Sequence, residues 1–486
     1  MRSDSPMMRR VRSNFLKYKI PKKGRIRFFL VIGLLIAGIW TGFKIFKNKT
    51  TTPEPKKTAL SDAAPVKTAK KEKKKAVKKE KPARKKTTAR KPSANHQKQG
   101  SKLVLPFTTG DLAELVKENH PDLAHSKDSV KFRDKNLLVH YSINTGLQEL
   151  GISLMNKYHP LYGAVAAIDP VSGRVLVLVT YKNDSVPDLG PLYHRSLFPA
   201  ASLFKTITAA AAIETGNLSS ESMIQHAGRN HTLYRFQLER ELKNFIEVPF
   251  EQAFAQSINP IFARIGMYSL QKGSLVNYGN RFGFNSPIPF DIQTEISQMN
   301  SPDSAFDIAE LASGFNQQTT ISPVHAAMIA GAICENGKMQ RPTLIDSIMM
   351  SDSCIYRARK ETWRVPIKEN TSSELRKMMK GVSRYGTARK SFRYIRQSER
   401  FANIEYGGKT GSVDKDGIGR VDWFMGFGRN PDDQSQRIAV AVLTVHGSNW
   451  TVHSSFIAAE LIRIHLRTLQ IEQEKLQKAI VEAKAG

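Results

Sequence analysis

The stretch PAASLFKTITAAAAIETG, residues 199–216, combines a predicted helix with a candidate nucleophile and base. Its alanine-rich half has strong helix propensity, and Gly216 is a natural helix end. If the helix starts near Ser202, Lys205 lies one turn on and shares its face, so the hydroxyl and the amine can meet. A lysine can activate a serine if burial or a neighbouring cation lowers the lysine pKa, and the free N–H groups of a helix N-terminus can stabilise an oxyanion. Taken alone, the tetrapeptide 202–205 fits a capped helix with a solvated lysine better than it fits a catalytic pair.

The positive charge of the chain is concentrated at its N-terminal end. The 486 residues carry a formal net charge of +31. Residues 1–102 hold about +26 of it, which leaves about +5 for residues 103–486. The basic composition is therefore no argument for nucleic-acid binding. No close spacing of His, Cys, Asp and Glu indicates a metal, and no glycine-rich phosphate loop opens a helix, so we expect no metal and no cofactor.

An uncharged run, FFLVIGLLIAGIWTGF, covers residues 28–43, and apolar character resumes at Ile45 and Phe46. We expect residues 28–46 to form a transmembrane anchor, with a cleaved signal peptide or a buried core helix as alternatives. The run is preceded by the more basic flank. The positive-inside rule then makes residues 1–27 a cytoplasmic tail and puts the rest of the chain on the periplasmic side of the inner membrane.

The next segment, residues 47–102, is rich in Lys, Ala, Pro and Thr and has almost no large apolar side chain. Such a composition cannot bury a core, and its like charges keep it extended. We expect a disordered tether that lifts a folded domain off the membrane. A polycation that also binds anionic envelope polymers or lipid head groups is the alternative, and a DNA-binding tail is disfavoured by the topology.

The folded part starts near residue 103, with a short lead-in segment over 103–139 and a main domain over 140–468. Two apolar, β-branched runs around a Pro- and Gly-containing turn predict a hairpin, and three more strands connected by short loops suit an antiparallel meander. The predicted strands are 164–168, 174–179, 408–413, 422–427 and 437–445. Residues 217–300 are expected to be mostly helical with polar loops. A helix from Ser454 to Arg467 and a charged helical tail over 469–486 complete the chain.

Three short motifs stand in order along this domain: Ser202-x-x-Lys205, Ser257-Ile258-Asn259 and Lys409-Thr410-Gly411. The ordered set resembles the penicillin-binding protein and serine β-lactamase superfamily, whose signature is S-x-x-K, S-x-N and K-T-G. Further segments are similar to the transpeptidase domain of that family, over roughly residues 140–467. These are Asn144-Thr145-Gly146-Leu147-Gln148, the hairpin 164–179, Gly386-Thr387-Ala388 and Asp422-Trp423-Phe424-Met425-Gly426-Phe427. The resemblance implies an α+β fold with an antiparallel five-stranded sheet flanked by helices.

The resemblance also implies roles for the catalytic side chains. Ser202 would be the nucleophile that attacks a terminal D-Ala-D-Ala carbonyl, and Lys205 would be its base. Ser257 would relay the proton to the leaving amine, and Asn259 would bond the substrate amide. Lys409 would be a second cation, which helps to keep Lys205 neutral because two close cations disfavour each other's charged forms.

Substrate binding is expected on the strand that follows Lys409. Thr410 would bind the terminal carboxylate, and Gly411 belongs to the same substrate-binding strand. The backbone N–H groups of Ser202 and Ser412 would form the oxyanion hole. Ser412 stands where the family most often has threonine, but its backbone N–H is retained, so we expect little effect.

The leading functional prediction is a membrane-anchored peptidoglycan D,D-transpeptidase that is acylated by β-lactams. Neither a glycosyltransferase region nor a large pedestal domain precedes the domain, so we expect a monofunctional protein. Its expected partners are peptidoglycan stem peptides, β-lactams, the inner membrane and cell-wall synthesis proteins, with no nucleic acid. A D,D-carboxypeptidase or endopeptidase shares every motif. A β-lactamase would need a deacylating carboxylate, and no glutamate in 217–256 stands out. A β-lactam sensor would need a cytoplasmic output domain, for which the 27-residue tail is too short, and a catalytically silent scaffold is a further alternative.

The only two cysteines, Cys334 and Cys354, are too few for a disulfide scaffold or a thiolate zinc site. We expect two free thiols, with Cys334 buried on an apolar helix face and Cys354 in a surface turn. The alternative is a disulfide that closes a loop of about twenty residues.

Overall fold

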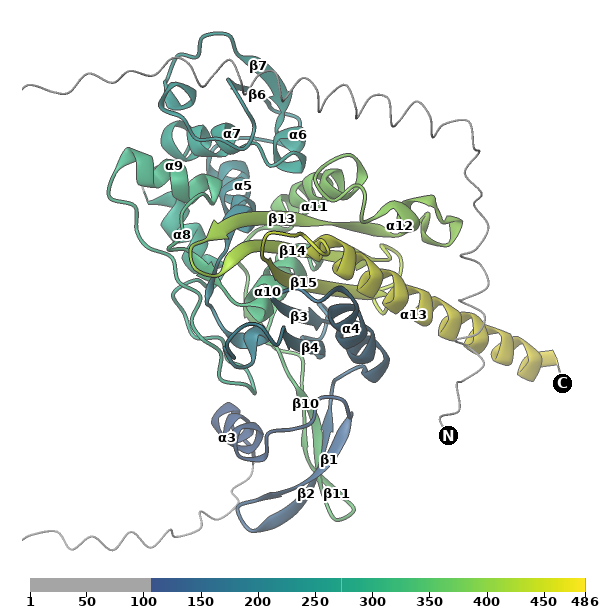
Figure 1. The fold of residues 1–486 in the computed structure, drawn as a ribbon. Helices are drawn as coiled ribbons and strands as arrows, with labels where there is room; N and C mark the ends of the chain where they lie inside the picture. The colour runs from purple at the N-terminus through teal and green to yellow at the C-terminus, as the bar shows by residue number, and fades with distance from the viewer. Residues whose placement is uncertain (1–105, 272, 486) are drawn as a thin grey trace, which may run out of the picture. The chain divides into compact units, whose positions relative to one another are not determined.

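An antiparallel sheet of five strands lies at the centre of the computed structural model, which describes residues 106–271 and 273–485 (Figure 1). In sheet order the strands are β13 (Glu405–Lys415), β14 (Gly419–Arg429), β15 (Arg437–His446), β3 (Tyr162–Ile168) and β4 (Val175–Lys182). The three middle strands are almost wholly buried, which explains their continuous apolar sequences. The predicted α+β fold with a five-stranded antiparallel sheet is confirmed, and β13 lies at one edge of that sheet.

Helices cover both faces of this sheet. On one face, α10 (Pro323–Cys334) is buried along its whole length, which is why it is apolar all round. On the other face lie α4 (Thr145–Tyr158) and α13 (Ser454–Ala485), which runs on beyond the sheet as an exposed helix (Figure 1). Glycine lets α13 approach closely, because a Cβ on Gly428 would lie 2.5 Å from Ile462 Cγ2.

A smaller four-stranded sheet lies below the central one in Figure 1, and the sequence did not predict it. Its order is β1 (Lys127–Phe132), β2 (Lys135–Tyr141), β10 (Ile345–Met350) and β11 (Ser353–Arg357). The helix α3 (Thr109–Asn119) precedes β1. The described part of the predicted lead-in segment 103–139 therefore has regular structure, and its second strand, β2, pairs with β10 some 200 positions later.

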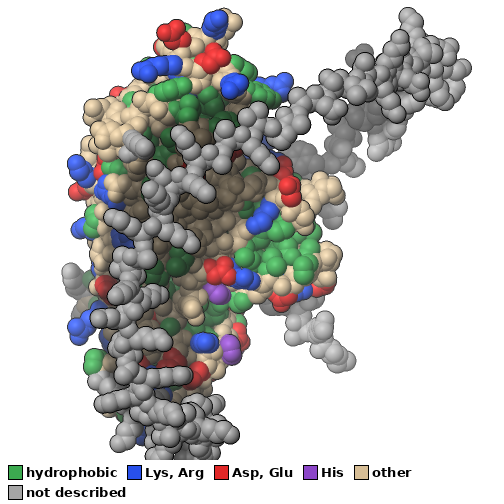
Figure 2. Space-filling model, turned by 90° about the vertical axis from the view of Figure 1, so that its left-hand side faces the viewer, with side chains coloured by type: hydrophobic (Ala, Val, Ile, Leu, Met, Phe, Trp, Pro, Cys, Tyr) green, Lys and Arg blue, Asp and Glu red, His purple; other side chains and the backbone are tan. Residues whose placement is uncertain are grey.

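The prediction that residues 217–300 are mostly helical is wrong in part. The segment contains the hairpin of β6 (Met223–His226) and β7 (Ile246–Pro249). Its helices are short: a 3-10 turn (Arg235–Leu238), α6 (Phe250–Ala255), α7 (Asn259–Arg264), a π-turn (Ile265–Ser269) and α8 (Ser274–Arg281). The side chain of buried Gln237 forms hydrogen bonds with backbone N–H and C=O groups of the loop between the two strands. These backbone groups would be paired with one another in a helix, and here the Gln237 side chain pairs them instead. Hydrophobic side chains are visible near the upper end of the face in Figure 2, and Met223, Phe245 and Ile246 of this hairpin region are exposed.

The predicted anchor 28–46 and tether 47–102 lie outside the described residues. Among the residues that the structure does describe, no helix is both long enough and apolar enough to cross a membrane.

Candidate active site

Ser202 lies in a short 3-10 turn, Ala201–Phe204, that leads directly into α5 (Lys205–Thr215). The residue before it, Ala201, has a φ of 49°, a left-handed conformation that is strained for a residue with a Cβ. The Lys205 Nζ donates a hydrogen bond to Ser202 Oγ at 2.7 Å. The structure therefore brings the hydroxyl and the amine together, as their spacing predicted.

Lys205 is completely buried, and none of its hydrogen-bond partners within residues 106–271 and 273–485 is a carboxylate. Its Nζ also donates to Asn259 Oδ1 at 2.7 Å and to the backbone carbonyl of Ser313 at 2.6 Å. Burial, and secondly the nearby Lys409 cation, hold the Lys205 pKa well below its ordinary value of 10.5. A buried amine that releases its proton readily, in contact with a serine hydroxyl, has the properties of a general base.

Ser257 and Asn259 lie where α6 ends and α7 begins, on the wall beside Lys205. Ser257 has a φ of 57°, and its N–H donates to Phe254 O at 3.1 Å, which ends α6 with a sharp change of direction. Asn259 is the first residue of α7, and its N–H donates to Asn230 O at 2.7 Å. Both side chains are buried at 6% exposure, so they are held between the two lysines rather than in solvent.

Lys409 reaches this wall from β13. It is fully buried, and its Nζ donates to Ser257 Oγ and to Thr410 O, both at 2.9 Å. Burial lowers the Lys409 pKa to about 7, so the residue is only partly charged at neutral pH. The five predicted catalytic residues thus form two hydrogen-bonded groups, one in which Lys205 bonds Ser202 and Asn259 and one in which Lys409 bonds Ser257. The two groups are neighbours, because the Lys409 charge contributes to the lowered pKa of Lys205.

The three predicted substrate-binding residues follow Lys409 along β13. A Cβ on Gly411 would lie 3.3 Å from Ser202 N, so the strand passes close to the nucleophile there. The Thr410 hydroxyl lies 2.6 Å from the hydroxyl of Thr387. Ser412 donates its hydroxyl to Asp422 Oδ1 at 3.2 Å, which turns that side chain toward β14.

Three residues of the site carry no role in the sequence-based prediction. The carbonyl of Ser313 bonds Lys205, Thr387 pairs with Thr410, and Asp422 bonds Ser412. A signal existed for two of them. Asp422 is an acidic residue inside an otherwise apolar strand, and Thr387 belongs to the short motif 386–388. The contact of Ser313 is made by its backbone, which no side-chain pattern reports.

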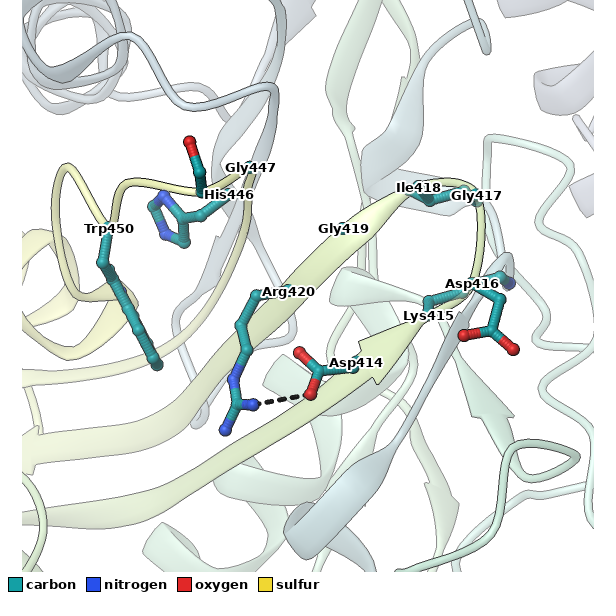
Figure 3. Close-up of a pocket in the computed structure, with 11 residues that line it drawn as sticks. Asp414, Lys415, Asp416, Gly417, Ile418, Gly419, Arg420, His446, Gly447 and Trp450 are labelled. Carbon is teal, nitrogen blue, oxygen red and sulfur yellow. Dashed lines mark hydrogen bonds and ion pairs between the residues drawn. The ribbon is translucent and has the colours of Figure 1, made fainter. Parts of the chain in front are cut away.

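A cavity of about 570 Å³ lies at the turn between β13 and β14, and none of the eight predicted site residues lines it (Figure 3). Arg420 forms an ion pair there with Asp414 at 2.8 Å, and its guanidinium lies 5.6 Å from the Trp450 ring centroid. The chemistry of the Ser202 cluster is therefore not located in this cavity.

The two cysteines are free, as predicted, and Cys334 is buried in α10. Cys354 is exposed, but it lies on strand β11 opposite Met349 and not in a turn. Burial raises the pKa of the Cys334 thiol to about 12. Within residues 106–271 and 273–485, no group of three or more His, Cys, Asp or Glu side chains is placed to hold a metal ion.

Comparison with known proteins matches this arrangement to one family. Residues 163–463 fit the family model described as penicillin binding protein transpeptidase domain. Among curated proteins, the peptidoglycan D,D-transpeptidase PbpA of Mycobacterium tuberculosis is 24% identical over 350 residues, which cover 63% of this chain and 67% of that protein. Penicillin-binding protein 3 of Bacillus subtilis is 23% identical over 319 residues, covering 58% of this chain and 44% of that protein.

Solved structures show the same fold at low sequence identity. The D,D-transpeptidase domain of a peptidoglycan glycosyltransferase from Eggerthella lenta has a TM-score of 0.58 and 19% identity, covering 73% of this chain and 87% of that one. The imipenem acyl-enzyme complex of penicillin-binding protein A from M. tuberculosis has a TM-score of 0.54 and 23% identity, covering 67% and 78%. The family model spans more than half of the chain and includes all eight predicted site residues, and on this evidence the chain belongs to the penicillin-binding protein transpeptidase domain family.

Proposed function

We propose that this chain is a peptidoglycan D,D-transpeptidase that forms an acyl-enzyme on Ser202 and is inhibited by β-lactams. The observation that carries the proposal is the Lys205 amine, which is buried, has a lowered pKa and lies 2.7 Å from Ser202 Oγ, with no carboxylate bonded to it in the described part of the chain. The family match and the name of the mycobacterial relative support the same reaction class.

In the first half-reaction, neutral Lys205 takes the Ser202 proton while Oγ attacks the carbonyl carbon of the penultimate D-Ala. The backbone N–H groups of Ser202 and Ser412 stabilise the oxyanion, and such a donor contributes about 3 kcal/mol in a comparable hydrolase. The peptide bond then breaks, and the terminal D-Ala leaves as an amine that receives its proton through Ser257. Asn259 orients the substrate amide, and Lys409 bonds the Ser257 hydroxyl that carries the proton.

In the second half-reaction, an amine of a neighbouring stem peptide attacks the acyl-enzyme. It forms the new amide, releases Ser202 Oγ and returns a proton to it. A D,D-carboxypeptidase or endopeptidase differs only in that water takes the acyl group. β-Lactamase activity is disfavoured, because among the described residues no carboxylate hydrogen-bonds to Ser202 or Lys205.

The experiment that separates these activities uses the purified full-length protein and a pentapeptide that ends in D-Ala-D-Ala. With an acceptor amine present, mass analysis should find the cross-linked peptide together with free D-Ala. Tetrapeptide alone, with no cross-linked product at any acceptor concentration, would contradict transpeptidation and support the carboxypeptidase.

The proposed chain organisation follows the sequence. Residues 1–27 are a cytoplasmic tail, 28–46 a single membrane anchor and 47–102 a tether, and the domain acts on the periplasmic side of the inner membrane. We further propose that residues 103–486 fold and bind penicillin without the preceding segments. Loss of binding in a protein shortened to those residues would contradict that boundary.

A further inference from the structure

The motif Gly386-Thr387-Ala388 forms a tight turn at the end of α11 (Glu369–Arg384), and the turn is fixed to α6. The Thr387 N–H donates to Ala255 O at 3.1 Å. A Cβ on Gly386 would lie 2.3 Å from that same carbonyl oxygen, so a larger residue there would displace the turn. Because α6 leads directly to Ser257, the turn holds a fixed position relative to the Ser257 wall of the site.

The Thr387 side chain crosses from this wall to β13. Its Oγ1 lies 2.6 Å from Thr410 Oγ1, Thr387 is exposed, and Thr410 is half-buried. Thr410 in turn follows Lys409, whose Nζ bonds both Thr410 O and Ser257 Oγ. A pair of hydroxyls from two different elements therefore opens to solvent at the rim of the catalytic cluster.

The other hydroxyl on this stretch of β13 is engaged elsewhere. Ser412 Oγ donates to Asp422 Oδ1, and Asp422 Oδ2 also accepts the N–H of Ser454 at the start of α13. Asp422 is only 3% exposed, whereas Ser412 is exposed, and the hydrogen bond to Asp422 uses the one proton of the Ser412 hydroxyl. Thr387 is consequently the hydroxyl that accompanies Thr410, although it lies on another element.

We propose that Thr387 and Thr410 together bind the terminal carboxylate of the substrate, with each hydroxyl donating to one carboxylate oxygen. This inference rests on the proposed function and adds a binding residue to it. A threonine hydroxyl has one proton, so the free pair can use only one proton between its members. A carboxylate accepts both protons, and hydrogen bonds to a charged acceptor are the stronger ones. Lys409 is only partly charged at neutral pH, which increases the share of carboxylate binding that falls to the hydroxyls.

The test measures the second-order rate constant of acylation of the full-length protein by benzylpenicillin and by its methyl ester, which lacks the anionic carboxylate. The main variant is Thr387→Val, which keeps the side-chain shape and removes the hydroxyl. Thr387→Ser keeps the hydroxyl. Thr362→Val is the matched control, because Thr362 is also exposed and its hydroxyl also bonds a side-chain partner, Gln340 Oε1, at a distance of 3.1 Å. Neither Thr362 nor Gln340 belongs to the site.

We expect Thr387→Val to slow acylation by the free acid about tenfold or more, as for a lost hydrogen bond to a charged group, and acylation by the ester by less than about twofold. Thr387→Ser and Thr362→Val should stay within about threefold of the wild type for both compounds. Equal slowing of acid and ester by Thr387→Val would show that Thr387 only supports the strand, and no slowing of either would show that it has no role. Both results overturn the inference. A wild-type protein that neither compound acylates would instead overturn the proposed function, and this inference with it.

Discussion

Replacing Lys409 by methionine should abolish acylation and make the folded protein more stable near neutral pH. Methionine fills a similar volume without the charge. In the unfolded chain Lys409 has its ordinary pKa of 10.5, whereas burial lowers the pKa in the folded protein to about 7. Between these two values the unfolded state binds more protons, so the stability of the wild type rises with pH over that window.

The expected magnitude follows from this pKa difference. One pKa unit corresponds to about 1.4 kcal/mol, so at about pH 7.5 the buried lysine costs the folded state about 4 kcal/mol. The variant also loses the hydrogen bonds to Ser257 Oγ and Thr410 O, at about 1 kcal/mol each. Lys409→Met should therefore be more stable than the wild type by about 2 kcal/mol at about pH 7.5, and its advantage should disappear by about pH 9.5.

The assay is urea unfolding of the full-length protein at these two pH values, followed by tryptophan fluorescence, since Trp423 is fully buried. The exposed Lys390→Met serves as the control and should change stability little at either pH. If Lys409→Met were less stable than the wild type by the same amount at both pH values, burial of the Lys409 amine would carry no free-energy cost. That result would refute the expected stabilisation.

Three further predictions concern other residues of the described structure. Lys205→Ala should reduce penicillin acylation by at least a hundredfold, which stopped-flow labelling checks, and a wild-type rate would require another base. Asp422→Ala should lower the free energy of unfolding by about 2 kcal/mol in urea titrations, because it leaves its bonding partners in β13 and α13 unpaired; an unchanged value would contradict its structural importance. In thiol titration of the native protein Cys354 should react at once and Cys334 only after denaturation, and two fast thiols would show that Cys334 is not buried as described.

The strands near the site could be predicted from the sequence because their signal is local. The runs 422–427 and 437–445 are continuous and apolar, and the structure buries them on both faces in β14 and β15. The Ser202–Lys205 contact was likewise predictable, since three residues of helical spacing fix it. Ser257 and Lys409 could be assigned to the same site only through the family resemblance, because no local sequence pattern indicates that these two distant residues are in contact.

What could not be predicted depends on pairing between distant segments. Strand β2 pairs with β10, which lies about 200 residues later, and short strands of mixed polarity such as β1 give no strong periodicity. The loop around Gln237 is held by hydrogen bonds between the Gln237 side chain and the backbone. Such bonds leave no periodic pattern in the sequence, so this loop could not be told from a polar loop within a mostly helical segment. Similarly, the roles of Thr387 and Asp422 emerge only when β13, β14 and the turn after α11 are placed together.

The most direct test of the central claim is the mass of the intact full-length protein after incubation with benzylpenicillin, followed by peptide mapping. We expect one penicilloyl adduct per chain on the peptide that contains Ser202, and no adduct on a Ser202→Ala variant with unchanged circular dichroism. Stoichiometric labelling of that variant, or an adduct mapped to any other residue in the wild type, would contradict it.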